Sequence, residues 1–137
     1  MAIRATNKDQ FATKMQFVVE TASTVTAGRA VVCGNADGEA LNAGADSDLA
    51  IGIALTSGTA GQKVDVALFG PVIPVLVGTG GATRGTKMIL VADGVTDAPA
   101  HDSDGTGNEA IYGIFIESGV AGDTVGAILS GASNRGS

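Results

Sequence analysis

The 137-residue chain has no Trp, one Tyr, four Phe, three Pro, one Cys and one His. A single Cys excludes an internal disulfide framework and a cysteine-rich zinc site, and a lone His allows histidine chemistry only through that one side chain. No run of about 18 apolar residues exists, so the sequence offers no membrane-spanning helix. The N-terminus has no apolar signal-peptide core, so we expect synthesis in a reducing cytoplasm.

Positive charge is also scarce. Eight Lys and Arg against 14 Asp and Glu give a net charge of −6, which argues against nucleic acid as a partner. Glycine is abundant, with 21 residues, and hydrophobic residues make up 45% of the chain. This composition is typical of a folded chain rather than a disordered one. With so few aromatic residues, the core of the expected single domain must consist of Val, Ile, Leu and Ala.

Short apolar runs rich in Val and Ile recur along the chain, separated by Gly, Asp, Asn and Ser. The runs are four to eight residues long, and no ten-residue segment has the 3.6-residue period of a helix. This pattern is typical of a sandwich or barrel. We therefore predict an all-β fold, a compact β-barrel or β-sandwich-like domain, with strands near 16–20, 30–34, 50–56, 62–69, 72–77, 87–92, 110–117 and 124–129.

An internal repeat relates 52–70 (GIALTSGTAGQKVDVALFG) to 113–131 (GIFIESGVAGDTVGAILSG), with 9 of 19 positions identical. In each copy a Ser-Gly-x-Ala-Gly connection joins two strands and is too short for a helical crossover, so each copy should be an antiparallel pair. A weaker echo relates 31–38 to 88–94. Two related halves joined through 71–87 are expected, with these matched positions buried: Ile53, Leu55, Val64, Val66, Leu68, Ile114, Ile116, Val125 and Leu129.

The repeats belong to a predicted single β domain at 16–131. Three segments differ from the repeats. Residues 1–15 carry three basic residues against one acidic residue and are predicted to form an N-terminal arm. Residues 93–109 hold five of the 14 acidic residues and no Lys or Arg, so we predict a long solvated loop there. Residues 132–137 are predicted to be a flexible tail.

Two lysine motifs invite a chemical interpretation. Glycine spacing across 78–87 is close to that of a phosphate-binding loop, but Thr86 precedes Lys87 and a strand follows, which favours a plain glycine-rich loop. Lys14-Met15 and Lys87-Met88 are similar to the modified lysine of biotinyl and lipoyl carriers. That lysine needs a hairpin tip, whereas Lys87 should begin a strand and Lys14 should lie in the arm.

Other candidate ligands are isolated. The segment Asp102-Ser103-Asp104-Gly105 resembles the start of a calcium loop, but the twelfth position is Gly113 instead of the required Glu. His101 has no second base or ligand in a recognisable arrangement, and Cys33 is interpreted as a small buried hydrophobe. We therefore expect no catalytic residues, no cofactor and no metal.

With the repeat laid out, the chain resembles the small capsid decoration, or cement, proteins of tailed bacteriophages. The resemblance runs from about Phe17 to Leu129 and rests on a Gly-(Ile/Val)-Ala strand followed by Gly-(Asp/Glu)-x-Val-x-Val. The segments that carry it are AIGIA at 50–54, GQKVDVALFG at 61–70 and GDTVGAIL at 122–129. Gln62 departs from the acidic position of this pattern, whereas Asp123 keeps it.

The resemblance implies a non-enzymatic β protein on the outer capsid surface of the virion, assembled in the host bacterial cytoplasm. It would clamp neighbouring subunits of the major capsid protein, as a homotrimer and with no nucleic-acid or membrane partner. A small carrier domain and a self-assembling tube or fibre module stay open as alternatives.

Three features select the residues for contact with the shell or with other subunits. The arm combines basic and apolar side chains. The run at 72–77 contains a proline and should form an edge strand or lie against a loop. Phe115 should face outward, opposite to Ile114 and Ile116. The predicted contact residues are Ile3, Arg4, Lys8, Phe11, Lys14, Phe17, Pro71, Pro74 and Phe115.

Overall fold

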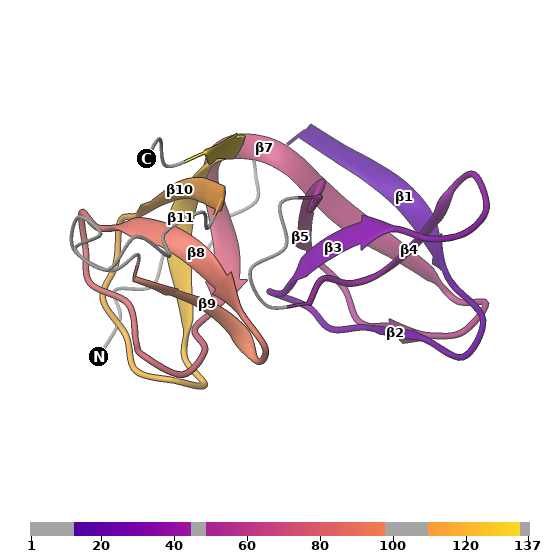
Figure 1. Ribbon diagram of the computed structural model, residues 1–137, viewed down its shortest axis with the longest axis horizontal. Coiled ribbons are helices and arrows are strands. Elements are labelled where there is room, and N and C mark those ends of the chain that lie inside the picture. The colour runs from indigo at the N-terminus through magenta and orange to yellow at the C-terminus, as the bar shows by residue number, and fades with distance from the viewer. Residues whose placement is uncertain (1–12, 45–48, 98–109, 135–137) are drawn as a thin grey trace.

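The computed structural model describes residues 13–44, 49–97 and 110–134, and this part of the chain is all β, as the sequence predicts (Figure 1). The strands are β1 (Thr13–Val19), β2 (Thr24–Val25), β3 (Ala30–Cys33), β4 (Glu39–Asn42), β5 (Gly52–Ala54), β6 (Gly58–Thr59), β7 (Lys63–Leu76), β8 (Lys87–Val91), β9 (Gly94–Asp97), β10 (Ala110–Phe115) and β11 (Thr124–Asn134).

The described residues from 13 to 69 form a closed barrel, called the first barrel below. Its strands are neighbours in the order β1–β4–β3–β5–β7, and a further β1–β7 pairing closes the ring. The β1–β4 pair is parallel and the other pairs are antiparallel. Closure leaves no continuous open edge of the sheet to pair with another chain.

The described residues from 70 to 134 form the second barrel, and β7 belongs to both barrels. The second half of β7 pairs with β11, and the strand order continues through β10 and β8 to β9. A parallel bridge joins Val77 to Val95, and the Gly78 N–H donates to the Val95 carbonyl at 2.8 Å. These contacts return β9 to the end of β7. Figure 1 shows β7 crossing from one barrel to the other.

The two barrels correspond strand for strand. The strands β1, β3, β4, β5 and the first half of β7 match the second half of β7, β8, β9, β10 and β11. The pairing registers agree as well: Val31–Gly52 and Phe17–Val64 in the first barrel match Met88–Gly113 and Val75–Val125 in the second. The segments 52–70 and 113–131 are therefore parts of a longer structural repeat that includes all of these strands.

Two glycines occupy corresponding close approaches between strands. A Cβ on Gly52 would collide with the carbonyl oxygen of Ala67, and a Cβ on Gly113 would collide with that of Ile128. Glycine is therefore required at both positions, because only a residue without a side chain lets the backbones come this close.

Each barrel encloses an aliphatic interior that includes a phenylalanine. The first contains Phe17, Val19, Val25, Val31, Ala40, Ala54, Val64 and Val66. At the corresponding positions the second contains Val75, Val77, Ala82, Met88, Val95, Phe115, Val125 and Ala127. The first barrel combines Phe17 with Ala54, and the second combines Val75 with Phe115. The large ring therefore comes from a different strand in each barrel, while each interior keeps a large and a small side chain at this pair of positions.

The structure corrects several predicted boundaries. The predicted strands at 62–69 and 72–77 are one strand, β7, so 71–76 is part of the second barrel instead of a connection. Residues 94–97 form β9 within the predicted loop, and 13–15 belong to β1 instead of the arm. The strands β4 and β9 escaped prediction because EALN and GVTD lack a Val/Ile-rich run. Residues 132–134 belong to β11, so the predicted tail at 132–137 begins too early. The rest of the predicted arm, 1–12, lies outside the described residues, as do 98–109 and 135–137.

Candidate functional site

The two barrels meet along a seam formed by three residues on the outside of the first barrel. Ala30, Ile53 and Ala67 are neighbours across β3, β5 and β7. All three are buried, and they belong to one apolar cluster with the interior of the second barrel. Ile53 is only 1% exposed although it points away from its own barrel interior. The second barrel therefore covers this outer row of the first.

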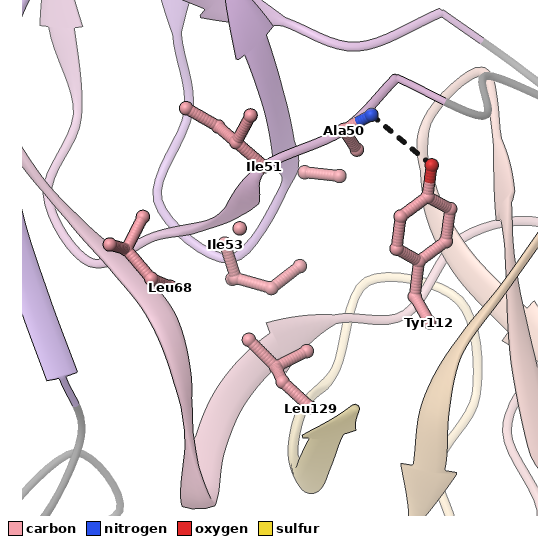
Figure 2. Close-up of a pocket in the computed structure, with 8 residues that line it drawn as sticks. Ala50, Ile51, Ile53, Leu68, Tyr112 and Leu129 are labelled. Carbon is pink, nitrogen blue, oxygen red and sulfur yellow. Dashed lines mark hydrogen bonds between the residues drawn. The ribbon is translucent and has the colours of Figure 1, made fainter. Parts of the chain in front are cut away.

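Polar contacts fasten the seam. The Ala50 N–H donates to the Tyr112 hydroxyl at 3.2 Å, as Figure 2 shows. The Leu76 N–H donates to the Gly28 carbonyl at 2.8 Å. The Arg29 guanidinium donates to backbone carbonyls on both sides, those of Ala43 and Ala92. Buried polar groups of the seam thus find partners, which avoids the cost of leaving them unsatisfied.

A small apolar cavity lies within the seam. Its volume is about 20 Å³, which is on the order of one water molecule. Figure 2 shows Ile53, Leu68, Leu129 and Tyr112 around it. The full lining is Ala30, Ala50, Ile51, Gly52, Ile53, Leu68, Tyr112 and Leu129. A cavity of this size is a packing gap between the barrels and is too small for an organic ligand.

The corresponding outer row of the second barrel is open to solvent. Lys87, Ile114 and Ile128 are neighbours across β8, β10 and β11 in the same register as the seam row of the first barrel. Ile114 is 43% exposed and Ile128 is 44% exposed. We call this row the open face. Its two isoleucines lie directly opposite each other on adjacent strands, so they form one apolar patch.

The predicted outward orientation of Phe115 is wrong. Phe115 is fully buried inside the second barrel, and Ile114 takes the exposed side of β10. The period-2 alternation of a strand makes neighbouring side chains point to opposite faces but does not tell which face is inside. The interior of the second barrel has Val75 where the first has Phe17, so the ring of Phe115 supplies the bulk there.

Other burial predictions are mixed. Ile53, Val64, Val66, Val125 and Leu129 are buried as predicted, whereas Leu55, Leu68 and Ile116 are half-buried and Ile114 is exposed. Cys33 is exposed at the end of β3, so its interpretation as a buried hydrophobe is wrong. It is the last residue of β3, where it pairs with Ala40 next to the β3–β4 turn.

Most residues predicted for contact do not gather into one surface. Phe17 is inside the first barrel, and Lys14 is exposed on β1. Pro71 and Pro74 lie in the second half of β7, which pairs with β11 on one side and contacts the loop at Gly28 on the other, so this half is locally an edge as predicted. Proline is tolerated there because β1 and β5 pair only with the first half of β7. Ile3, Arg4, Lys8 and Phe11 lie outside the described residues.

Ile128 is a surface residue that was not predicted, although its place in the repeat distinguishes it from its counterpart. Ile128 aligns with Ala67. The larger side chain in the second copy indicates that the two positions have different surroundings. In the structure, Ala67 lies in the seam and Ile128 lies on the open face.

Aspartates next to the glycine-rich loop 78–86 fasten that loop to β9. Thr79 donates to Asp93 through its N–H at 2.9 Å and through its hydroxyl at 2.7 Å. Thr83 makes the same two bonds to Asp97, at 2.7 Å and 2.6 Å. The Thr79 bonds, assisted by the nearby Arg29 charge, hold the pKa of Asp93 below its ordinary value of 3.8. These carboxylates therefore have a structural use.

The remaining chemical motifs are placed as follows. Lys87 is the first residue of β8 and Lys14 is the second of β1, so neither sits at the hairpin tip that a carrier lysine needs. Within 13–44, 49–97 and 110–134, no group of three or more His, Cys, Asp and Glu could hold a metal. In the same ranges, no helix has the length and apolar character to span a bilayer. His101 and the Asp102–Gly105 motif lie outside these ranges.

Comparison with solved structures shows a similar fold in a known protein. No protein-family model matches the sequence, and no curated protein matches it. The structure is similar to the crystal structure of the head fiber gp8.5 N base in bacteriophage phi29. The TM-score is 0.65, the match covers 86% of this chain and 93% of that chain, and the sequence identity is 16%. The similarity shows that the two-barrel fold also occurs in a phage head fiber.

Proposed function

We propose that this chain is a structural protein of a bacteriophage head. The observation that carries the proposal is the fold match, because it covers 86% of this chain and therefore includes residues of both barrels. The resemblance of the GIA and GDxV segments to capsid decoration proteins points independently to the same kind of particle. Fold alone does not specify function, so the agreement between these two indications matters.

The finer proposal is a decoration, or cement, role. The protein would bind the outer surface of the shell and stabilise contacts between subunits of the major capsid protein, without enzymatic activity. The predicted basic arm at 1–12 supplies a means of attachment, because it combines basic and apolar side chains. Many weak contacts of this kind add up to strong attachment when the binding partner is multivalent.

A second candidate is the base of a head fiber, and the phi29 match favours it specifically. The two candidates differ in their effect on the shell. A cement protein stabilises the joints between capsid subunits, whereas a fiber base only needs to attach an appendage. A cement protein should therefore raise the temperature at which the shell disrupts, and a fiber base should leave that temperature unchanged.

The decisive experiment mixes purified protein with expanded shells that lack it, followed by sedimentation and thermal disruption of the shells. Co-sedimentation with a raised disruption temperature supports the cement role. Co-sedimentation without that increase supports the fiber base. Failure to bind shells from the phage that encodes the protein would overturn both.

A deletion of residues 2–12 tests the arm within the same assay. Because β1 begins at Thr13, the deletion leaves every described strand intact. We expect the shortened protein to keep the β-rich circular dichroism spectrum of the full chain and to bind shells more weakly. Saturation of shells with unchanged affinity and equal protection from heat would contradict a role for the arm.

A further inference from the structure

We infer that the open face of the second barrel, centred on Ile114 and Ile128, is an interface between copies of this chain. The inference rests on the internal symmetry of the molecule and does not depend on the proposed role at a phage head.

The first step is the difference between two corresponding rows. The row in the first barrel joins Ala30, Ile53 and Ala67, and the row in the second joins Lys87, Ile114 and Ile128, through the same strand pairings. The first row is buried. In the second, both isoleucines expose more than two-fifths of their surface. The corresponding pair of the first barrel, Ile53 and Ala67, is covered by another barrel, so we infer a comparable contact for this exposed pair.

The second step identifies the partner. Within this chain, a five-stranded barrel covers the seam row of the first barrel. We therefore infer that the open face, which has the same strand register as the seam row, can pack against the outside of another such barrel. A second copy of the chain supplies such a barrel, and contact through the open face would continue the packing that the seam already shows.

The third step is charge. Lys87 stands beside Ile114 where the seam row has Ala30. Lys87 is exposed, so it lies at the rim of the patch as a cation. The chain as a whole has a net charge of −6. A second copy therefore carries an excess of acidic side chains that can pair with this cation, and an apolar centre with a charged rim is the usual arrangement of an interface.

Sedimentation velocity of the full-length protein, from low micromolar to near-millimolar concentration, tests the inference. We expect the wild type to self-associate. The double variant Ile114→Thr/Ile128→Thr keeps β-branched side chains suited to strands and should associate at least about tenfold more weakly. Lys87→Glu should weaken association to a smaller extent, and more so at low salt.

A matched control is Val120→Thr, because Val120 is 70% exposed but lies in the β10–β11 connection, outside the open face. This variant should associate as the wild type does. A wild type that stays monomeric throughout the concentration range would overturn the inference, and so would a folded double variant that associates normally. Binding to shells by a strictly monomeric protein would likewise refute it and would assign the open face to the shell.

Hydrogen exchange of the wild type provides a test that needs no variant. Protection at 113–115 and 127–129 should increase with protein concentration, whereas protection at 52–54, already covered by the second barrel, should not. Equal behaviour of the two segments would contradict the inference even if the double variant failed to fold.

Discussion

The two barrels give corresponding residues opposite surroundings. Ile53 and Ile114 occupy the same position in the repeat and the same register between strands, yet Ile53 is 1% exposed and Ile114 is 43% exposed. Both point away from their own barrel interior. Ile53 is buried because the second barrel covers it, and no described part of the chain covers Ile114 to that extent. Burial in this molecule therefore depends on a neighbouring barrel as well as on strand alternation.

Corresponding positions inside the two barrels have the same surroundings but different side chains. Eight interior positions of each barrel correspond, but the side chains differ at most of them. The pair Phe17 and Ala54 becomes Val75 and Phe115. A barrel interior can therefore take its large side chain from either of two strands, as long as the space stays filled. The outer rows differ instead according to whether another barrel covers them.

The largest expected effect comes from removing the ring inside the second barrel. Because Phe115 is fully buried, Phe115→Ala should reduce the free energy of unfolding by about 3–5 kcal/mol, measured by urea denaturation. Phe115→Leu, which keeps most of the volume, is the control and should cost much less. A loss of well under about 1 kcal/mol for the alanine variant would mean that the ring lies on the surface.

The next test compares the two equivalent isoleucines directly. Ile53→Ala should cost about 2–5 kcal/mol because it opens a cavity in the seam. Ile114→Ala should cost less than about 1 kcal/mol at concentrations where the protein is monomeric, since the side chain is already largely hydrated. Differential scanning calorimetry on both variants suffices. Equal losses would remove the distinction between seam and open face.

Two corresponding turns should respond alike. Gly61 has φ of 83° and Gly122 has φ of 94°, so each backbone is in the left-handed region. Replacing either by Ala should destabilise the protein by about 1–2 kcal/mol, measured by chemical denaturation. Gly44→Ala is the control, because no left-handed φ and no contact within 4 Å oppose a side chain there. Clearly unequal effects at Gly61 and Gly122 would show that the two turns are not equivalent.

The smallest effect concerns a contact that the first barrel lacks. The Thr79 hydrogen bonds lower the pKa of Asp93 in the folded state. The stability that the Asp93 carboxylate contributes is therefore present above the ordinary pKa of 3.8 and is lost as the pH falls through the lowered value. We expect the stability difference between wild type and Asp93→Asn to shrink as the solution is acidified below pH 4. A difference that is constant with pH would exclude this contribution.

Much of the strand pattern is readable in the sequence. The predicted strands near 30–34, 87–92 and 124–129 match β3, β8 and the first part of β11, because Val/Ile runs between turn residues carry a clear signal. The strands β4 and β9 carry no such run and form because they pair with β3 and β8 across a tight turn. The sequence also could not predict that β7 continues through Pro71 and Pro74, because this depends on which strands pair with each half of β7.

The candidate surface was less predictable than the fold. Alternation told us that Ile114 and Phe115 face opposite ways, and the repeat told us that Ile53 and Ile114 are equivalent. Neither could tell which side of β10 is interior, because the ladders of β10 and β11 contain irregularities near Gly113 and Leu129 and a shift of one residue exchanges the two faces. The expectation that Ile53 is buried was right, but the covering element is the second barrel instead of its own interior.

By itself, the sequence determined an all-β chain, an aliphatic composition of its core, and a repeat whose glycines recur at matching close approaches such as Gly52 and Gly113. These properties are local, because they depend on side-chain shape, period and backbone freedom. Only the tertiary structure decided that the halves share one strand, that Phe115 fills the second barrel, and that Ile53 is covered while Ile114 stays open. Those outcomes depend on which surfaces meet, and no local pattern in one strand encodes its distant neighbour.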